Sequence, residues 1–124
     1  MHVHLVFVTK YRRGVFDDEM LNTCEETMRK VCGDFGAELV EFNGEKDHVH
    51  LLVNYPPKVP VSGLVNSLKG VSARILRRDF TGRCNRALMH GHLWSPSYFA
   101  ASCGGAPLSV IRQYIENQQR PSGS

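Results

Sequence analysis

The chain has 124 residues, of which 42% are hydrophobic and 22% are charged, and its formal net charge is +3. This composition is typical of one globular domain and excludes an intrinsically disordered chain. No apolar run approaches the roughly 20 residues that cross a bilayer, so no membrane-spanning helix is predicted. The N-terminal residues do not resemble an export signal, and we therefore expect a cytoplasmic protein with no membrane partner.

The small net charge conceals a strong asymmetry along the chain. Residues 17–47 hold ten acidic side chains against three basic ones, whereas residues 48–124 hold two acidic against nine basic. Residues 10–13 form a further basic group that includes a tyrosine ring. This segregation predicts one acidic solvated face and one basic face suited to a polyanion, and a cationic group with a stacking ring suits single-stranded nucleic acid.

The first part of the chain predicts a strand followed by a helix. Residues 4–9 are mostly β-branched or aromatic, which favours a strand. Asp17 is a good helix N-cap, and acidic residues follow it in the first turn, where the helix dipole favours them. Apolar residues then recur at helical spacing, and Gly33 or Gly36 would end the helix. We interpret this stripe as core.

A β-hairpin is predicted next, and its second strand carries two histidines. Residues 37–42 alternate as a strand, and residues 43–46 are typical of a turn, in which Asn43-Gly44 is a strong hairpin signal. In the strand that follows, alternation places His48 and His50 on one face and apolar residues on the other. Two imidazoles side by side on a rigid strand form half of a metal site, although an isolated H-x-H is more often a strand that merely contains histidines.

The second half predicts two helices around a fourth strand. A proline-rich connection leads to an apolar stripe that predicts a long helix over residues 61–80, with cations on its other faces. Residues 93–100 are aromatic and extended, which favours a strand, and residues 108–119 form a last helix. The order β-α-β-β-α-β-α predicts an α+β, ferredoxin-like fold, in which helices pack on one face of an antiparallel four-stranded sheet.

The absence of common catalytic and metal-binding motifs limits the candidate functional residues. No P-loop, nucleophile elbow, EF-hand or H-E-x-x-H helix occurs, and no two of the four cysteines form a C-x-x-C pair. Three H-x-H pairs occur in the chain. His2/His4 lies at a terminus expected to fray, and His90/His92 flanks a glycine in a loop region. His48/His50, in the predicted hairpin, is therefore the best placed of the three.

Two polar residues of the last helix could complete a site. Tyr114 and Gln118 lie one helical turn apart and project together. Periodicity alone makes Tyr114 most simply a core-facing aromatic, whereas the long amide of Gln118 on the same apolar stripe needs a polar partner.

Four ordered blocks of the chain carry a family resemblance: residues 4–13 (HLVFVTKYRR), residues 47–52 (DHVHLL), residues 94–99 (WSPSYF), and Gly104-Gly105 ahead of residues 114–118 (YIENQ). Together they resemble the small single-tyrosine HUH transposases of bacterial and archaeal insertion sequences that move as single-stranded DNA. The resemblance covers nearly the whole chain, which would be one transposase domain over residues 1–120 with a disordered tail over residues 121–124. Family members usually have more chain before the first strand, which puts some DNA contacts in doubt.

The resemblance implies a metal-dependent enzyme. His48, His50 and Gln118 match the ligands of a divalent ion (Mg²⁺ or Mn²⁺), and Tyr114 matches the nucleophile that forms a 5′-phosphotyrosine link with DNA. Family members are homodimers that act on hairpins at insertion-sequence ends, and the tyrosine helix can serve the other subunit's histidines. The residues implied in DNA binding are Lys10, Tyr11, Arg12, Arg13, Lys69, Arg74, Arg77 and Arg78.

Two alternatives use the same fold. An HUH replication initiator or relaxase would share the chemistry, but the short chain and the fourth block disfavour it. A non-catalytic nucleic-acid-binding module is the other alternative. RNA-recognition domains of this architecture place aromatic residues on the exposed sheet face, whereas histidines are expected on that face here.

Overall fold

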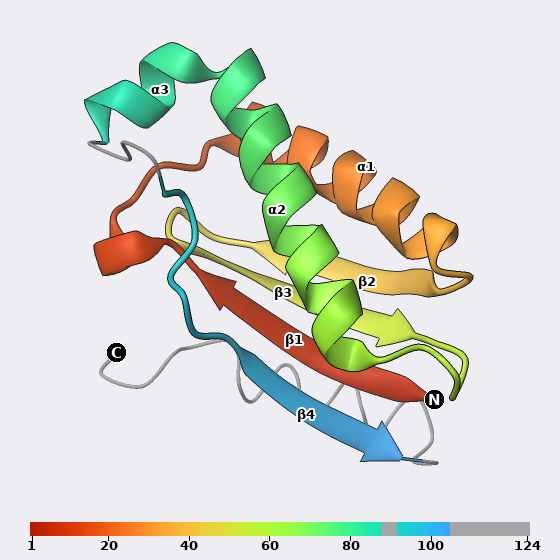
Figure 1. The fold of residues 1–124 in the computed structure, drawn as a ribbon. Helices are drawn as coiled ribbons and strands as arrows, with labels where there is room; N and C mark the ends of the chain where they lie inside the picture. Colours follow the sequence, from red (N-terminus) through yellow and green to blue (C-terminus); the bar gives the residue numbers. More distant parts are fainter. Residues whose placement is uncertain (88–91, 105–124) are drawn as a thin grey trace.

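The computed structural model describes residues 1–87 and 92–104. The predicted last helix, with Tyr114 and Gln118, lies outside these described residues. Four strands form one antiparallel sheet in the order β2-β3-β1-β4, and the long helices α1 and α2 lie together over one face of it (Figure 1). The strands are β1 (His2–Val8), β2 (Glu38–Gly44), β3 (His48–Asn54) and β4 (Phe99–Gly104). The helices are the 3₁₀ turn η1 (Lys10–Arg12), α1 (Asp18–Asp34), α2 (Val61–Asp79) and α3 (Thr81–Arg86).

The core lies between the helices and one face of the two central strands. Every second residue of β1 and β3 is apolar and at most 2% exposed, because alternation turns these side chains toward the helices. They are Val3, Leu5 and Phe7 of β1 and Val49, Leu51 and Val53 of β3. We call this side the helix-covered face. The arrangement confirms the predicted ferredoxin-like fold.

The two long helices begin and end close to where the sequence predicts. Asp17 is the N-cap of α1, and its carboxylate accepts a hydrogen bond from the backbone N–H of Met20 at 2.9 Å. After α1 the chain turns at Gly36, whose φ of +71° lies in the left-handed region that glycine tolerates. The second predicted helix, over residues 61–80, is α2, and the chain after it forms a short separate helix, α3, which contains Arg83 and Arg86.

The hairpin turn predicted over residues 43–46 begins two residues later, after Asn43 and Gly44. Both residues belong to β2, where Asn43 pairs with His50 and Gly44 with Val49, and the turn follows at residues 45–47. The small size of Gly44 is explained by packing against α1, not by the backbone conformation of a turn. A Cβ at Gly44 would lie 2.5 Å from Cδ2 of Leu21 on α1, so any other residue here would force the Leu21 side chain to move.

The fourth strand is also displaced from its prediction at residues 93–100. Trp94 forms only an isolated bridge with Thr9, and β4 begins at Phe99. The indole is 6% exposed and donates a buried hydrogen bond of 3.0 Å to the hydroxyl of Ser72 on α2. The segment therefore fills the core near the end of β1. The backbone N–H of Ser95 donates to the carbonyl of Val8 at 2.7 Å, but the continuous pairing of β4 with β1 begins only at Phe99.

The N-terminal strand does not fray. β1 begins at His2 and lies between β3 and β4, where it pairs with both. The N-terminal ammonium of Met1 donates to the side-chain oxygen of Asn54 and to the carbonyl of Tyr55, both at 3.1 Å. The first histidine pair is thus held at the centre of the sheet.

Candidate active site

The histidine pair of β3 lies on the face of the sheet opposite the helices. We call this the histidine face, and its residues are His2, His4, Val6 and Val8 of β1 and His48, His50, Leu52 and Asn54 of β3. His48 and His50 are each 4% exposed, and their ring centroids are 5.0 Å apart with the planes at 78°. The predicted sharing of one face by these two imidazoles is confirmed.

Asp47 orients the ring of His48. Nδ1 of His48 lies 2.8 Å from the Oδ1 atom of Asp47 and donates a hydrogen bond to this carboxylate. Partial burial raises the pKa of Asp47, but the hydrogen bond from His48 and the charge of the Arg12 guanidinium outweigh it, so the pKa is held below its usual value. With the proton on Nδ1, Nε2 carries the lone pair, and among the described residues this buried atom has no hydrogen-bond partner. Nε2 of His48 therefore has the environment of a metal-ligating nitrogen.

The basic stretch after β1 lies at the same end of the sheet. Thr9 donates its backbone N–H to the carbonyl of Asp47 at 2.8 Å, and its hydroxyl donates to the carbonyl of Arg13 at 2.7 Å. Nε and Nη2 of Arg12 each donate to Oδ2 of Asp47 at 3.3 Å. An ion pair this exposed contributes at most about 1 kcal/mol to stability. It nevertheless links Arg12, predicted to bind DNA, to the candidate metal ligand His48, because both contact the carboxylate of Asp47.

The backbone of η1 turns an aromatic ring outward. Tyr11 and Arg12 have φ values of 62° and 53°, a left-handed conformation that non-glycine residues seldom adopt. The Tyr11 side chain is 71% exposed, with Nζ of Lys10 at 5.3 Å and the guanidinium of Arg13 at 5.1 Å from its ring centroid. A base could stack on this ring while the cations contact phosphates, since stacking and charge are the two parts of single-strand binding.

His4 belongs to the same cluster, although the sequence favoured another pair. Its ring is fully buried, and its Nε2 lies 3.2 Å from Nδ1 of His50. The two rings are stacked, with planes at 13° and centroids 5.4 Å apart. Burial lowers the pKa of His4 from its ordinary value, which favours the neutral imidazole. The signal that could have found it is the near repeat of HVHLV and HVHLL on strands that become neighbours.

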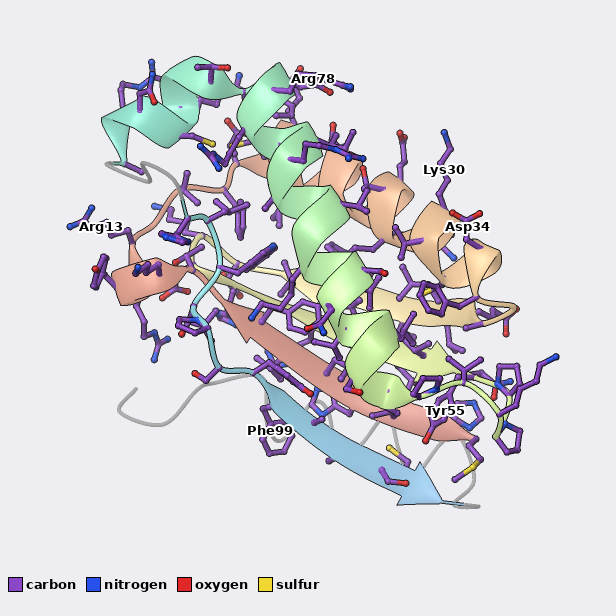
Figure 2. The ribbon with its side chains drawn as sticks, viewed as in Figure 1. Arg13, Lys30, Asp34, Tyr55, Arg78 and Phe99 are labelled. Carbon is purple, nitrogen blue, oxygen red and sulfur yellow. The ribbon has the colours of Figure 1, made fainter. Side chains whose placement is uncertain are left out.

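The cations of α2 lie in the helix layer, away from the histidine face. Nζ of Lys69 donates to the carbonyl of Ser95 at 2.6 Å, which fastens the segment before β4 to α2, and its partial burial lowers its pKa. Arg78 points away from the sheet near the end of α2 and pairs with Asp79 at 2.8 Å (Figure 2). Arg74 and Arg77 are exposed on the same helix. The structure thus separates the predicted DNA-binding residues into two groups in different layers.

The described residues supply part of a metal site only. Within residues 1–87 and 92–104, no group of three or more His, Cys, Asp or Glu side chains could hold a metal ion. The predicted third ligand Gln118, the nucleophile Tyr114 and His90 of the third pair lie outside these ranges, and His92 is exposed. In the same part of the chain, no helix is long and apolar enough to cross a membrane.

Comparison with known proteins identifies relatives over almost the full length. Residues 1–118 match the protein family described as "Transposase IS200 like". The ISDra2 transposase TnpA of Deinococcus radiodurans is 30% identical over 118 residues, which cover 95% of this chain and 84% of that protein. The transposase for insertion sequence element IS200 of Salmonella typhimurium is 31% identical over 115 residues, which cover 93% of this chain and 74% of that protein.

Solved structures give the same relation. A putative transposase from Deinococcus radiodurans R1 superposes with a TM-score of 0.76 and 35% identity, over 95% of this chain and 90% of that chain. A REP-associated tyrosine transposase bound to a REP hairpin superposes with a TM-score of 0.61, over 95% of this chain and 67% of that chain. At 12% identity, the second likeness is one of fold.

Proposed function

The chain belongs to the IS200-like transposase family, and we propose that it cleaves and rejoins single-stranded DNA at insertion-sequence ends through a metal-assisted phosphotyrosine intermediate. The observation that carries this proposal is the buried pair His48 and His50, with Asp47 behind one ring and an unpartnered Nε2 among the described residues. A buried histidine oriented by a carboxylate, next to a second histidine on the same face, is typical of a metal site.

The residues present fit a divalent metal ion. His48 and His50 would bind it through their Nε2 atoms, and Gln118 would add an amide oxygen. All three ligands are neutral, so a bound ion would keep its full +2 charge and stabilise the negative charge that develops on the phosphate in the transition state. Mixed nitrogen and oxygen ligands suit Mn²⁺ better than Mg²⁺, which prefers oxygen, although Mg²⁺ is the more abundant ion.

Tyr114 would be the nucleophile. Its phenol oxygen would form a bond to the phosphorus of a DNA phosphodiester as the bond from phosphorus to the 3′-oxygen breaks. The phenol loses its proton and the leaving oxygen gains one, which yields a 5′-phosphotyrosine and a free 3′-hydroxyl. Attack by a second 3′-hydroxyl reverses the step on another strand and releases the tyrosine. One phosphodiester replaces another, so no ATP is needed.

The chain's own cations would hold the substrate near the histidines. Tyr11 offers an exposed ring and Lys10, Arg12 and Arg13 offer positive charge beside Asp47, at the end of β3 where His48 lies. Single-stranded DNA that stacks on Tyr11 would therefore pass close to the metal ligands. The cations of α2 and the relative bound to a REP hairpin support a second contact with a DNA hairpin.

The deciding experiment measures covalent adducts with DNA. The native protein, with Mn²⁺ or Mg²⁺ and a labelled single strand containing a hairpin from the DNA that flanks the gene, should give a product that persists in denaturing gels. Tyr114→Phe should abolish it, and His50→Ala should abolish it while hairpin binding remains. Tyr98→Phe is the matched control, since this tyrosine is 40% exposed and also loses only a hydroxyl. An adduct that persists in Tyr114→Phe contradicts the assignment of the nucleophile. Binding without any adduct favours a non-catalytic module.

We further propose a homodimer in which the tyrosine of one subunit serves the histidines of the other. Mixing Tyr114→Phe subunits with His50→Ala subunits tests this arrangement. A mixed dimer contains one intact site only if the tyrosine acts across the interface, so adduct formation should reappear after subunit exchange. If the mixture stays as inactive as its components while exchange is shown by differently sized tags, the tyrosine acts within its own subunit.

A further inference from the structure

His4 occupies the middle of the histidine face without belonging to the predicted ligand set. Its backbone lies in the central strand β1, opposite Leu52 of β3 on one side and Ala101 of β4 on the other. Its side chain is fully buried, as is usual for apolar residues and unusual for a histidine. A buried imidazole in this position needs a polar partner, and the structure supplies one on the neighbouring strand.

That partner is the candidate metal ligand His50. His50 lies opposite Val6, so His4 is its diagonal neighbour across the β1–β3 pair. Nε2 of His4 is 3.2 Å from Nδ1 of His50, and the rings are nearly parallel. The ring of Phe99 contacts His4 edge-on at 5.8 Å between centroids, and Figure 2 places this residue at the start of β4. Both strand neighbours of β1 therefore fix the position of the His4 ring.

A histidine that binds a metal must be neutral, and a hydrogen bond between two neutral imidazoles has two proton arrangements. If Nε2 of His4 donates, Nδ1 of His50 accepts, and the single proton of His50 sits on Nε2, where it blocks metal binding through that atom. If Nδ1–H of His50 donates, Nε2 of His4 accepts, and Nε2 of His50 keeps its lone pair. Only the second arrangement is compatible with His50 as a ligand through Nε2.

We propose that His4 is a positioning residue that accepts the hydrogen bond from Nδ1–H of His50, and so holds the ring of His50 with Nε2 as its metal-binding atom. The inference rests on the proposed function, because it takes His48 and His50 as the ligands. It adds a residue from another strand to the site. The two ligands then have different supports: a carboxylate behind His48 and a neutral imidazole behind His50.

The test measures Mn²⁺ affinity of the whole chain by electron paramagnetic resonance of the free ion. His4→Phe keeps an aromatic ring but removes the acceptor, and should weaken binding by about 10–100-fold, the usual effect of losing such an outer partner. His4→Gln restores an acceptor and should recover most of the affinity. The matched control is His2→Phe, on the same strand and face but opposite Asn54, which should bind Mn²⁺ like the native protein.

A second measurement reads the proton directly in the metal-free protein. Nitrogen-15 NMR of the His50 ring should place the proton on Nδ1 in the native chain and in His4→Gln, and should show a shift toward Nε2 in His4→Phe. If His4→Phe does not fold, as judged by circular dichroism, His4→Leu gives a smaller side chain that also lacks an acceptor.

The possible failures are distinguishable. Native Mn²⁺ affinity and an unchanged His50 proton in His4→Phe overturn the inference and leave the metal site standing. Equal loss in folded His4→Phe and His4→Gln also overturns it, because the acceptor is then irrelevant. If His48→Ala binds Mn²⁺ as tightly as the native chain, the proposed metal site is wrong and this inference fails with it.

Discussion

The two faces of the central strands β1 and β3 use alternate residues of the same backbone for different purposes. The helix-covered face is apolar, and its side chains meet α1 and α2 in one core cluster. The histidine face carries three buried imidazoles outside that cluster, and His50 contacts both of the others, His4 and His48. Burial stabilises the first face through the hydrophobic effect, whereas burial of imidazoles contributes little unless each finds a partner. The core and the proposed metal site are thus separated by a single residue step along each strand.

The largest effect should come from a change on the histidine face. His48→Ala removes a proposed metal ligand, and we expect DNA cleavage to fall by about 10³-fold, since a metal ion contributes several kcal/mol to transition-state stabilisation. The midpoint of thermal unfolding should change little. Adduct yield and a thermal melt on the same sample measure both quantities. A large drop in melting temperature would show that the two faces are not separable.

The converse change is on the helix-covered face. Leu51 follows His50 directly in β3, and its side chain is fully buried. Leu51→Ala should lower the free energy of unfolding by about 2–5 kcal/mol, because it leaves a cavity in the core. Urea denaturation measures this loss. At a temperature where the variant is folded, its Mn²⁺ affinity should equal that of the native chain, and weaker binding would contradict the separation.

A smaller effect is expected behind His48. Asp47→Ala removes the acceptor of the Nδ1 proton and should weaken Mn²⁺ binding by about 10–100-fold. Arg12→Gln removes only the ion pair and leaves the acceptor in place, so its metal affinity should stay closer to native. The ratio of the two losses of Mn²⁺ affinity separates the orientation of the His48 ring from the effect of the charges around it. Equal losses would contradict this expectation, because the two substitutions remove charges of opposite sign and only Asp47→Ala removes the acceptor.

The smallest effect should lie in the helix layer. Asp17→Ala removes the N-cap of α1 and should lower the free energy of unfolding by about 1 kcal/mol, without a change in metal affinity. Asp17 also pairs with Arg83 of α3 at 3.0 Å. Asp17→Asn keeps a capping oxygen and loses the charge, so it should cost less than the alanine variant. Denaturant titration of the two variants measures the cap directly.

Elements with a clear local signal were predicted well from the sequence. The N-cap at Asp17, the long helix that begins at Val61 and the shared face of His48 and His50 all depend on residues within a few positions of one another. The errors fell where a distant residue decides. Gly44 was predicted in a turn but lies in β2, where it packs against Leu21 of α1. Trp94 was predicted in a strand but fills the core and contacts Ser72.

The amino-acid sequence by itself determined the ferredoxin-like class and the orientation of the β3 histidines, because both follow from the period of side chains along a strand or helix. Only the tertiary structure decided which residues stand behind those histidines. His4 reaches His50 across 46 positions, and Arg12 reaches Asp47 across 35. Such contacts depend on strand order and register, and a shift of one residue in β1 would turn His4 into the core. The register is set by the packing of the whole sheet on its helices, so it cannot be predicted from a local sequence pattern.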